Sequence, residues 1–413
     1  MREMKDSGIS WVGEIPKEWS VWRNKYIFKI TKDIVLPSKN YQLLSLTTTG
    51  IKEKDENDNG GKVPENYDGY QVVKENDLVM CLFDLDCSAV FSGLSPYNGM
   101  ISPAYKVLKV KKRIANEQYY RYWFNYVGSK RFYKQYSKSL RFTLNADEFN
   151  RLFSLLPSLV EQQRIAEFLD RECGKIDGLK ADIQAQIDTL EQYKRSIITE
   201  AVTHGLNPSA PMKDSGIPWV GKTPEYWKVG RIGGLYELRN QKVSDKDFMP
   251  LSVTMKGILP QLETAAKTND GDNRKLVRVG DFAINSRSDR RGSCGISDYD
   301  GSVSLINTIL KPRNRMNAKY YNWLFHTPMF ADEFYKWGHG IVDDLWTTNW
   351  SEMKRISIPL PPLDEQQEIA DYLDNKCAEI EQIIADKKSQ IETLDGYKKS
   401  LIYEYVTGKK EVE

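Results

Sequence analysis

Two segments of the 413-residue chain are written twice, and this duplication constrains the fold more than any other feature. MKDSGISWVGEIPKEWSV at residues 4–21 and MKDSGIPWVGKTPEYWKV at residues 212–229 are identical at 12 of 18 positions. The segment LPSLVEQQRIAEFLD at 156–170 is likewise repeated, as LPPLDEQQEIADYLD at 360–374. A period of about 205 residues is too long for a solenoid, whose repeats span roughly 20–50 residues. The sequence therefore predicts two copies of one domain-sized unit, each opening with the tryptophan-rich segment and closing with a long helix.

The bulk composition is that of a folded, water-soluble chain. Hydrophobic residues make up 40% and charged residues 28% of the sequence, which is typical of globular domains. No run approaches the roughly 18 apolar residues of a membrane span, and the polar start MREMKDSGIS lacks the apolar core of a signal peptide. We therefore expect a cytoplasmic protein that does not meet a membrane.

The cysteines and histidines predict neither disulfides nor a metal site. Five cysteines, an odd number, fit a reducing compartment better than a disulfide framework. No histidine stands near the one close pair, Cys81 and Cys87, whereas a zinc site needs about four ligands. Cys173 and Cys377 occupy equivalent places in the two closing helices, where we expect buried small residues.

The opening segments combine turn residues with two tryptophans, Trp11 and Trp19 in the first copy. Such alternation favours an irregular segment anchored on a surface over a helix. We interpret these tryptophans as anchors that fasten the entry of each domain.

The body of the first half shows short β-type runs at residues 42–46, 71–73, 77–83 and 104–110. A framework recurs in the second half, and between its positions the two halves differ freely, as expected when one scaffold carries two specificities. The first-half positions of this framework are Leu44, Ser45, Thr47, Gly50, Ile51, Asp77, Gly99 and Ser102, matched by Leu251, Ser252, Thr254, Gly257, Ile258, Asp281, Gly301 and Ser304.

Each half carries a basic cluster. In the first, a predicted helix over 116–135 has a core side of Tyr120, Trp123, Phe124 and Val127 and ends in the run Lys130, Arg131, Lys134, Lys138 and Arg141, interleaved with aromatics. In the second, Arg287, Arg290 and Arg291 stand in NSRSDRRGSCG, which predicts an exposed loop. Both clusters suit phosphates or guanine. A solvated helix face in the first half, and ion pairs with Asp289, Asp298 or Asp300 in the second, are equal alternatives. The net charge of +2 does not decide between them.

Apolar residues recur every seven positions in both closing segments, which predicts coiled-coil helices. The first segment, 159–204, would make a rod of about 70 Å. The two helices either pack antiparallel on each other within one chain, or each pairs with another chain. The repeating positions are Leu169, Ile176, Ile183, Leu190 and Ile197, supported by Ile165, Leu179 and Ile187, and then Leu373, Ile380, Leu394 and Leu401, with Lys387 interrupting and Ile369, Ile383, Ile384 and Ile391 alongside.

The predicted fold class is α+β, with two pseudo-twofold-related bodies separated by two long antiparallel coiled-coil helices. The linker NPSAP at 207–211 places the main boundary near residue 208. We expect four segments: a first body at 1–155, a first spacer helix at 156–206, a second body at 207–358 and a second spacer helix at 359–413.

Catalytic motifs are missing from the sequence. There is no GxxxxGK[ST] phosphate loop, no glycine-rich dinucleotide fingerprint, no GxSxG elbow and no HExxH helix. A duplicated scaffold without such a site favours a binding or measuring device over an enzyme.

The paired MKDSGIxWVG openings, the LPxLxEQQxIAxxLD helix starts and the Tyr-Lys-x-Ser helix ends at 193–196 and 397–400 closely resemble the specificity subunits of type I restriction-modification enzymes. The resemblance spans nearly the whole chain. It implies that each body is a target recognition domain reading one half of a bipartite, asymmetric sequence in double-stranded DNA, and that the helices set the gap. It also implies two methyltransferase subunits that use S-adenosylmethionine, restriction subunits that use ATP and Mg²⁺, and no cofactor on this chain.

We expect the reading residues to lie where the two bodies differ. Two other functions remain open: a specificity component of a related system with a fused nuclease and methyltransferase, and a coiled-coil scaffold for two protein-binding domains that never meets DNA. The candidate DNA-binding residues are Thr47, Thr48, Thr49, Lys134, Lys138 and Arg141 in the first body, and Lys256, Arg287, Arg290, Arg291 and His339 in the second.

Overall fold

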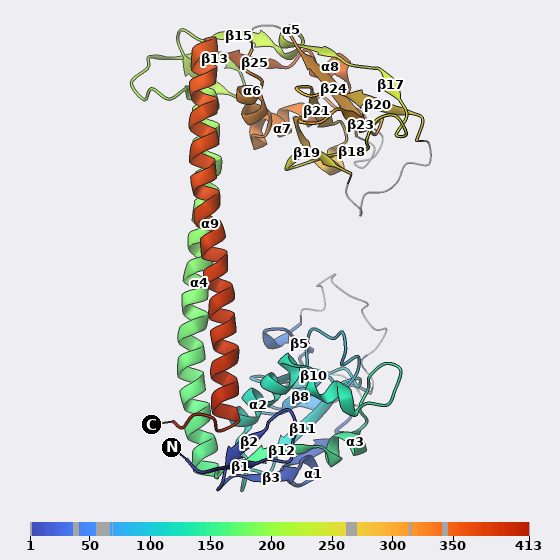
Figure 1. Ribbon diagram of the computed structural model, residues 1–413, viewed down its shortest axis with the longest axis vertical. Coiled ribbons are helices and arrows are strands. Elements are labelled where there is room, and N and C mark those ends of the chain that lie inside the picture. The colour runs from blue at the N-terminus through green and yellow to red at the C-terminus, as the bar shows by residue number, and fades with distance from the viewer. Residues whose placement is uncertain are drawn as a thin grey trace. The chain divides into compact units, whose positions relative to one another are not determined.

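The computed structural model of the chain describes residues 2–35, 41–54, 67, 69–261, 271–313, 316–340 and 346–412. It contains two compact units, which are described separately: unit 1 is Met1–Ile183 with Ser389–Glu413, and unit 2 is Gln184–Lys388. Each unit is α+β and holds one body together with parts of both long helices (Figure 1). The four segments expected above follow the sequence repeat rather than these units, and their boundaries stay a prediction.

The body of unit 1 is built on a four-stranded antiparallel sheet in the order β4-β11-β8-β9. The predicted strand runs at 42–46, 71–73, 77–83 and 104–110 correspond to β5, β7, β8 and β11. The strands are β4 (Phe28–Thr31), β5 (Leu44–Thr47), β6 (Gly50–Glu53), β7 (Gln71–Val73), β8 (Leu78–Met80), β9 (Ser92–Leu94), β10 (Gly99–Ile101) and β11 (Lys106–Val110). β5 pairs with β6 and β10 with β7.

Helix α2 (Glu117–Ser129) supplies the largest part of this core. Tyr120, Trp123, Phe124 and Val127 are fully buried, as predicted for its core side. The helix is shorter than expected, because the chain turns at Arg131, whose φ is +52°, before the 3₁₀ turn η1 (Phe132–Tyr136). The basic run after residue 129 therefore does not lie on a continuous helix face. The short helix α3 (Ala146–Arg151) follows it.

Unit 2 repeats this plan with a four-stranded sheet in the order β16-β24-β21-β22 and a three-stranded sheet in the order β17-β20-β23. Its strands are β16 (Tyr236–Leu238), β17 (Lys242–Val243), β18 (Leu251–Thr254), β19 (Gly257–Pro260), β20 (Arg274–Val277), β21 (Phe282–Asn285), β22 (Cys294–Ile296), β23 (Gly301–Val303) and β24 (Asn307–Pro312). Its helices are α6 (Ala318–Phe325), α7 (Pro328–Lys336) and α8 (Trp350–Met353), with a 3₁₀ turn η2 (Ser288–Arg290).

Two-stranded ribbons connect each body to the long helices. In unit 1 they are β1 (Met4–Asp6) with β2 (Glu14–Pro16), and β3 (Ser20–Arg23) with β12 (Phe153–Leu156). The short helix α1 (Asn24–Ile27) connects β3 to β4. In unit 2 they are β13 (Met212–Ile217) with β14 (Gly221–Pro224), and β15 (Lys228–Arg231) with β25 (Ser357–Leu360). The short helix α5 (Ile232–Leu235) connects β15 to β16.

The repeated motifs form the joint between helix and body. The indole N–H of Trp19 donates to Glu161 Oε2 at 2.8 Å, and that of Trp227 donates to Glu365 Oε2 at 2.9 Å. Both tryptophans are about 1% exposed. These carboxylates are the Glu of EQQ in each copy, so the two repeated motifs bind each other. The predicted role of the tryptophans as domain anchors is confirmed.

The Gln that follows each of these carboxylates also belongs to the joint. Gln162 Oε1 accepts from the backbone N–H of Asn116 at 2.8 Å, and Gln366 Oε1 accepts from that of Asn317 at 2.9 Å. Asn116 and Asn317 are the N-caps of α2 and α6. The motif therefore connects the first turn of each long helix to the main helix of its body.

Each unit uses the start of one long helix and the end of the other. α4 (Leu159–His204) and α9 (Leu363–Val406) are single helices of 46 and 44 residues. In unit 1 the Tyr119 hydroxyl donates to Val406 O at 3.0 Å, and in unit 2 the Tyr320 hydroxyl donates to Val202 O at 2.8 Å. The last turn of each helix is thus a core element of the body encoded by the other repeat.

The two helices run antiparallel within each unit, as Figure 1 shows for the segments that lie side by side. In unit 1 Lys398 pairs with Asp177 at 2.7 Å and Lys180 pairs with Asp395. In unit 2 Lys194 pairs with Glu381, and Lys387 donates to Gln186 at 2.5 Å. The intramolecular alternative is therefore the observed one. No described helix is long and apolar enough to cross a membrane.

Most of the predicted heptad positions are buried or half-buried. Leu169, Ile176, Leu373, Ile380 and Leu401 are buried, and Ile183, Leu190 and Leu394 are half-buried. The supporting role expected for Leu179 is wrong, because its side chain is 53% exposed, and Ile383 at the equivalent position is 45% exposed. Cys173 and Cys377 are buried, as expected.

Candidate nucleic-acid interface

The β5–β6 and β18–β19 hairpins present the first pair of differing surfaces. Thr47 Oγ1 donates to Gly50 O at 2.7 Å, and Thr254 Oγ1 donates to Gly257 O at 2.9 Å. Both glycines have positive φ, +111° and +103°, which glycine adopts without a steric penalty. The two turns therefore share one frame around different residues at their tips.

The exposed side chains at these tips are Thr48 and Thr49 in unit 1 and Met255 and Lys256 in unit 2. Thr49 is also held by Thr47, whose hydroxyl accepts the Thr49 N–H at 3.3 Å. Lys256 N–H likewise donates to the Thr254 hydroxyl at 3.1 Å. Held by the same hydrogen bonds, the two turns present short polar side chains in one unit and a thioether and an ammonium in the other.

The arginine loop of unit 2 connects β21 to β22. Arg287 and Arg290 lie 3.5 Å and 3.7 Å from the carboxylate of Asp289, so the two guanidinium groups share one acid. Arg291 pairs with Asp332, a partner that the sequence did not suggest. Both side chains of this last pair are more than half exposed, and such a surface pair is worth only about 0–1 kcal/mol. The arginines can therefore exchange their carboxylates for phosphates or base edges.

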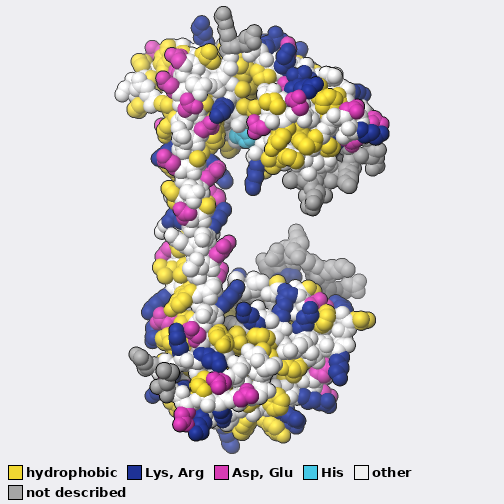
Figure 2. All heavy atoms as spheres, viewed as in Figure 1, with side chains coloured by type: hydrophobic (Ala, Val, Ile, Leu, Met, Phe, Trp, Pro, Cys, Tyr) yellow, Lys and Arg dark blue, Asp and Glu magenta, His cyan; other side chains and the backbone are white. Residues whose placement is uncertain are grey.

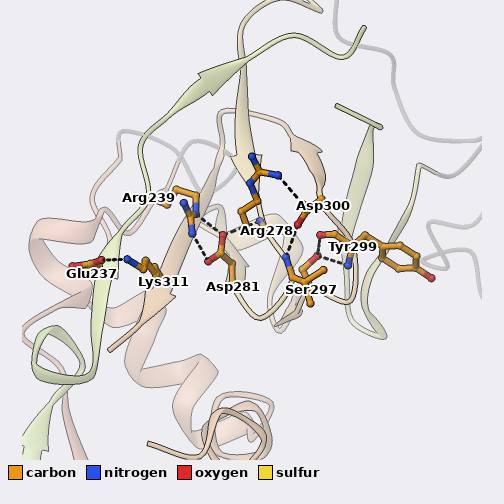
Figure 3. Close-up of polar contacts among 9 residues, drawn as sticks. Glu237, Arg239, Arg278, Asp281, Ser297, Tyr299, Asp300 and Lys311 are labelled. Atoms are coloured by element: carbon orange, nitrogen blue, oxygen red, sulfur yellow. Dashed lines mark hydrogen bonds and ion pairs between the residues drawn. The ribbon is translucent and has the colours of Figure 1, made fainter. Parts of the chain in front are cut away.

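Asp298 and Asp300 are not partners of these arginines. Asp300 instead accepts from Arg278 at 2.6 Å and from the backbone N–H of Val279 at 2.9 Å (Figure 3). No ion pair of Asp298 occurs within the described part of the chain. Of the three carboxylates proposed from the sequence, only Asp289 neutralises the loop.

A shared partner, Thr347, brings His339 beside the arginine loop. His339 and Thr347 exchange two backbone hydrogen bonds of 2.9 Å and 3.0 Å, and Arg287 forms a β-bridge with the same threonine. The Tyr335 hydroxyl donates to Arg290 O at 3.3 Å, and the Arg291 guanidinium lies 5.4 Å from the Tyr335 ring centroid. The structure thus gathers four predicted residues on one surface. Lys256 lies on a separate hairpin, whose strand β19 contacts β22, at the end of the arginine loop.

The corresponding loops of unit 1 carry the opposite distribution of charge. The loop after β8 holds the acid, Asp84, and the loop after η1 holds Arg141, which binds both Asp84 oxygens at 3.1 Å. The Lys134 ammonium lies 4.5 Å from the Phe142 ring centroid. Lys138 is exposed. Arg141 must therefore break its ion pair with Asp84 before it can bind a phosphate or a base. Lys138 has no carboxylate partner among the described residues.

The framework aspartates Asp77 and Asp281 have a structural role. In unit 2 the Arg239 guanidinium binds Asp281 at 2.5 Å and 3.0 Å, and the Arg278 N–H donates to the same carboxylate at 2.9 Å (Figure 3). In unit 1 the Lys74 N–H donates to Asp77 at 2.9 Å, but Thr31 occupies the position of Arg239. Burial accordingly raises the pKa of Asp77.

The strongly shifted groups elsewhere are core groups rather than activated ones. Burial raises the pKa of Tyr133 to about 12. Cys294 Sγ lies 3.7 Å from His326 Nε2, but burial raises the pKa of its thiol, the opposite of what a nucleophile needs. Within the described ranges, no three or more His, Cys, Asp or Glu side chains are placed to hold a metal ion.

Basic side chains are spread among acidic and hydrophobic ones on the face drawn in Figure 2, rather than gathered in a single patch. The side chain at the hairpin tip that sequence reasoning missed is Met255, which is 71% exposed. Its match to Thr48 within the framework was the available signal.

The family comparison matches residues 224–393 to the type I restriction modification DNA specificity domain. Two curated relatives come from Methanocaldococcus jannaschii. A sequence described as the specificity subunit of type I restriction enzyme MjaX is 23% identical over 97% of this chain and 96% of its own length. The specificity subunit of type I restriction enzyme MjaVIII is also 23% identical, over 83% of this chain and 81% of its own.

Solved structures share the fold. A chain from a study of complex assembly and conformational transition in a type I restriction-modification system superposes with a TM-score of 0.71 at 14% identity, covering 96% of this chain and 99% of that chain. The HsdS subunit from Thermoanaerobacter tengcongensis gives a TM-score of 0.50 at 16% identity, covering 96% and 98%. Along nearly its whole length the chain is therefore similar to specificity subunits of type I restriction-modification enzymes, and residues 224–393 match their DNA specificity domain.

Proposed function

We propose that the two bodies read the two halves of one bipartite, asymmetric target in double-stranded DNA. The observation that carries this proposal is the pair of matched hairpins. Thr47–Gly50 and Thr254–Gly257 build the same turn with the same side-chain hydrogen bond, yet they present Thr48 and Thr49 in one unit and Met255 and Lys256 in the other. A shared frame with unlike tips is what two base-reading sites on one scaffold require, because base edges are distinguished by their donors, acceptors and methyl groups.

The arginine loop of unit 2 supports the same assignment. Arginine binds guanine O6 and N7, or a phosphate, through two parallel hydrogen bonds. Arg287, Arg290 and Arg291 lie on one surface with His339, and their carboxylate partners are exposed. We assign these four residues and Lys256 to DNA contacts of unit 2. Thr48, Thr49, Lys134, Lys138 and Arg141 are assigned to unit 1, and Thr47, which Thr254 matches, holds the frame of the turn through its hydrogen bond to Gly50 O.

The long helices are proposed to set the number of unread base pairs between the half-sites. A helix of 46 residues spans about 69 Å. Its pairing with the second helix is held by ion pairs in both units, which makes a stiff spacer. One turn of duplex is roughly 34 Å, so a spacer of this length is compatible with readers on separate segments of the major groove.

Partner subunits are proposed to dock on the helices, where two equivalent apolar pairs remain exposed. In unit 1, Leu179 and Tyr397 lie at one level, because the pairs Asp177–Lys398 and Lys180–Asp395 flank them. In unit 2 the equivalent residues are Ile383 and Tyr193. All four side chains are at least 45% exposed. Two matching patches suit two copies of one methyltransferase subunit, which would bind S-adenosylmethionine, while restriction subunits would supply ATP- and Mg²⁺-dependent cleavage.

Methylation mapping of a host expressing the chain with a cognate methyltransferase subunit tests this function. The expected result is methylation of a two-part sequence with a constant gap. Replacing Met255 and Lys256 by threonine, the residues of the unit 1 turn, should change one half of that sequence only. A contiguous motif, or a change in both halves, would contradict the assignment. If the purified complex showed no salt-sensitive binding to duplex DNA, the non-DNA scaffold would be the better description.

A further inference from the structure

Unit 1 carries an aromatic groove that belongs to neither the hairpin nor the helix patches. Its volume is about 420 Å³, and it is lined by Val21, Trp22, Arg23, Tyr26 and Phe153 from β3, α1 and the first residue of β12. Trp22, Tyr26 and Phe153 are 41%, 51% and 44% exposed. Three large aromatic side chains are thus partly exposed to solvent around one concave surface. Such side chains are usually buried in cores or interfaces, so an exposed cluster of them indicates a binding surface.

One cation, Arg23, lines the groove, and two more, Lys25 and Lys111, lie beside it. The Arg23 guanidinium lies 5.7 Å from the Phe153 ring centroid, and the Lys25 ammonium lies 4.8 Å from that of Tyr26. Lys111 Nζ donates to Lys25 O at 3.0 Å. None of the three cations has a carboxylate partner among the residues that the structure describes. The groove therefore combines apolar walls with a positive rim.

The second repeat does not have this groove. In strand pairing, Arg23 faces Phe153 and Arg231 faces Ser357, so Ser357 stands where unit 1 has Phe153. Gly230 and Gly234 likewise stand in place of Trp22 and Tyr26. A Cβ added to Gly230 would lie 2.5 Å from Leu360 Cδ1, so the space used by a side chain in unit 1 is occupied in unit 2. The groove breaks the internal symmetry of the chain.

We propose that this groove binds an acidic protein segment that inserts aliphatic or aromatic side chains, and that it does so once per chain. Tryptophan, tyrosine and arginine are the residues that most often dominate binding at protein interfaces. Carboxylates on the segment complement Arg23, Lys25 and Lys111, which have none of their own. Duplex DNA fits less well, because its bases are already stacked and aromatic platforms bind unpaired bases. The segment binds once because only unit 1 provides the aromatic walls.

Fluorescence anisotropy with the whole chain and three labelled twelve-residue peptides tests the proposal. The first peptide alternates Glu and Gly around two central Leu residues, the second has Gly for Leu, and the third has Lys for Glu. We expect the first to bind at one site per chain and each of the others to bind at least tenfold more weakly. Giving unit 1 the residues of unit 2, by Trp22→Gly, Tyr26→Gly and Phe153→Ser, should weaken the first peptide at least tenfold.

Two further variants keep the test decisive if the triple variant unfolds. Arg23→Gln with Phe153→Ser alters only exposed groups and should weaken the first peptide at least fivefold. Tyr97→Ala removes an exposed aromatic outside the groove and should leave binding unchanged. Equal binding of all three peptides, two sites per chain, or unaltered binding by the groove variants would overturn the proposal. Displacement of the bound peptide by an unrelated duplex would assign the groove to DNA. Sequence-specific duplex binding by the unaltered chain is measured separately, so the proposed function stands or falls independently.

Discussion

Shortening both helices by one heptad tests the spacer most sharply. Lys180 pairs with Asp395, so residues 180–186 of α4 lie opposite residues 389–395 of α9 in an antiparallel pair. Deleting both segments removes seven residues from each helix and keeps the heptad register. At about 1.5 Å per residue the helix pair becomes about 10.5 Å shorter, which corresponds to about three base pairs at roughly 34 Å per turn of ten.

The expected result is an unchanged pair of half-sites separated by about three fewer base pairs. Three base pairs rotate a duplex by about 100°, whereas seven residues shift the face of an α-helix by only about 20°. The shortened protein must therefore bind twisted DNA, and we expect slower methylation as well as a shorter gap. Methylation mapping across a library of gap lengths measures both effects.

The matched control removes the same ion pair without changing length, by Lys180→Ala with Asp395→Ala. This control should leave the gap unchanged. The spacer reasoning would be refuted if the shortened helices gave altered half-sites with an unaltered gap.

Three further predictions concern single residues. Arg291→Ala should cost about 1–3 kcal/mol of binding at one base position if Arg291 reads a base; competition binding on single-base variants measures this, and an equal loss on every sequence would make it a phosphate contact. Trp19→Phe removes the indole donor to Glu161 and should lower the free energy of unfolding by about 1.5–3 kcal/mol in urea titrations. Trp22→Phe, at an exposed position, should change it little. Equal effects of the two substitutions would contradict a stabilising role of the Trp19–Glu161 hydrogen bond. Asp77→Asn should remove a pH dependence of stability: because burial raises the pKa of Asp77 above its ordinary value of 3.8, this group destabilises the fold as pH rises from that value through the folded-state pKa, and stability is constant above it. We expect the free energy of unfolding of the variant, minus that of the parent, to be larger at pH 7 than at pH 4 in urea titrations. A difference that is constant or decreases with pH would rule out this role.

The sequence predicted the parts of the fold that repeat or are periodic. Helix α4 begins at Leu159 and ends at His204, as its proline stop and heptads indicated. Its antiparallel pairing within the chain could not be derived, because a heptad pattern is the same for a partner in the chain and one outside it. The exposure of Leu179 was missed for a related reason. An apolar residue beside a heptad stripe either packs against the other helix or stays exposed, and periodicity does not distinguish these cases.

The candidate site was predicted as residue types rather than as an arrangement. The basic loop at Arg287–Arg291 was recognised from its composition, but its partner Asp332 and its neighbour His339 come from other elements. Contacts between residues far apart in the sequence depend on how the sheets pack, which no local pattern records. The hydrogen bond between the Glu of EQQ and the tryptophan of the opening segment could not be predicted for the same reason, although both motifs were recognised as repeats.

The central claim is that each body reads its own half of the target, and a chain with two identical bodies tests it most directly. Replacing residues 2–158 by the equivalent residues 210–362 gives both helix starts the same reader. Because α4 and α9 are antiparallel in each unit, methylation mapping should return a symmetric target made of two inverted copies of the unit 2 half-site. Retention of the original asymmetric target by this chimera would contradict the account.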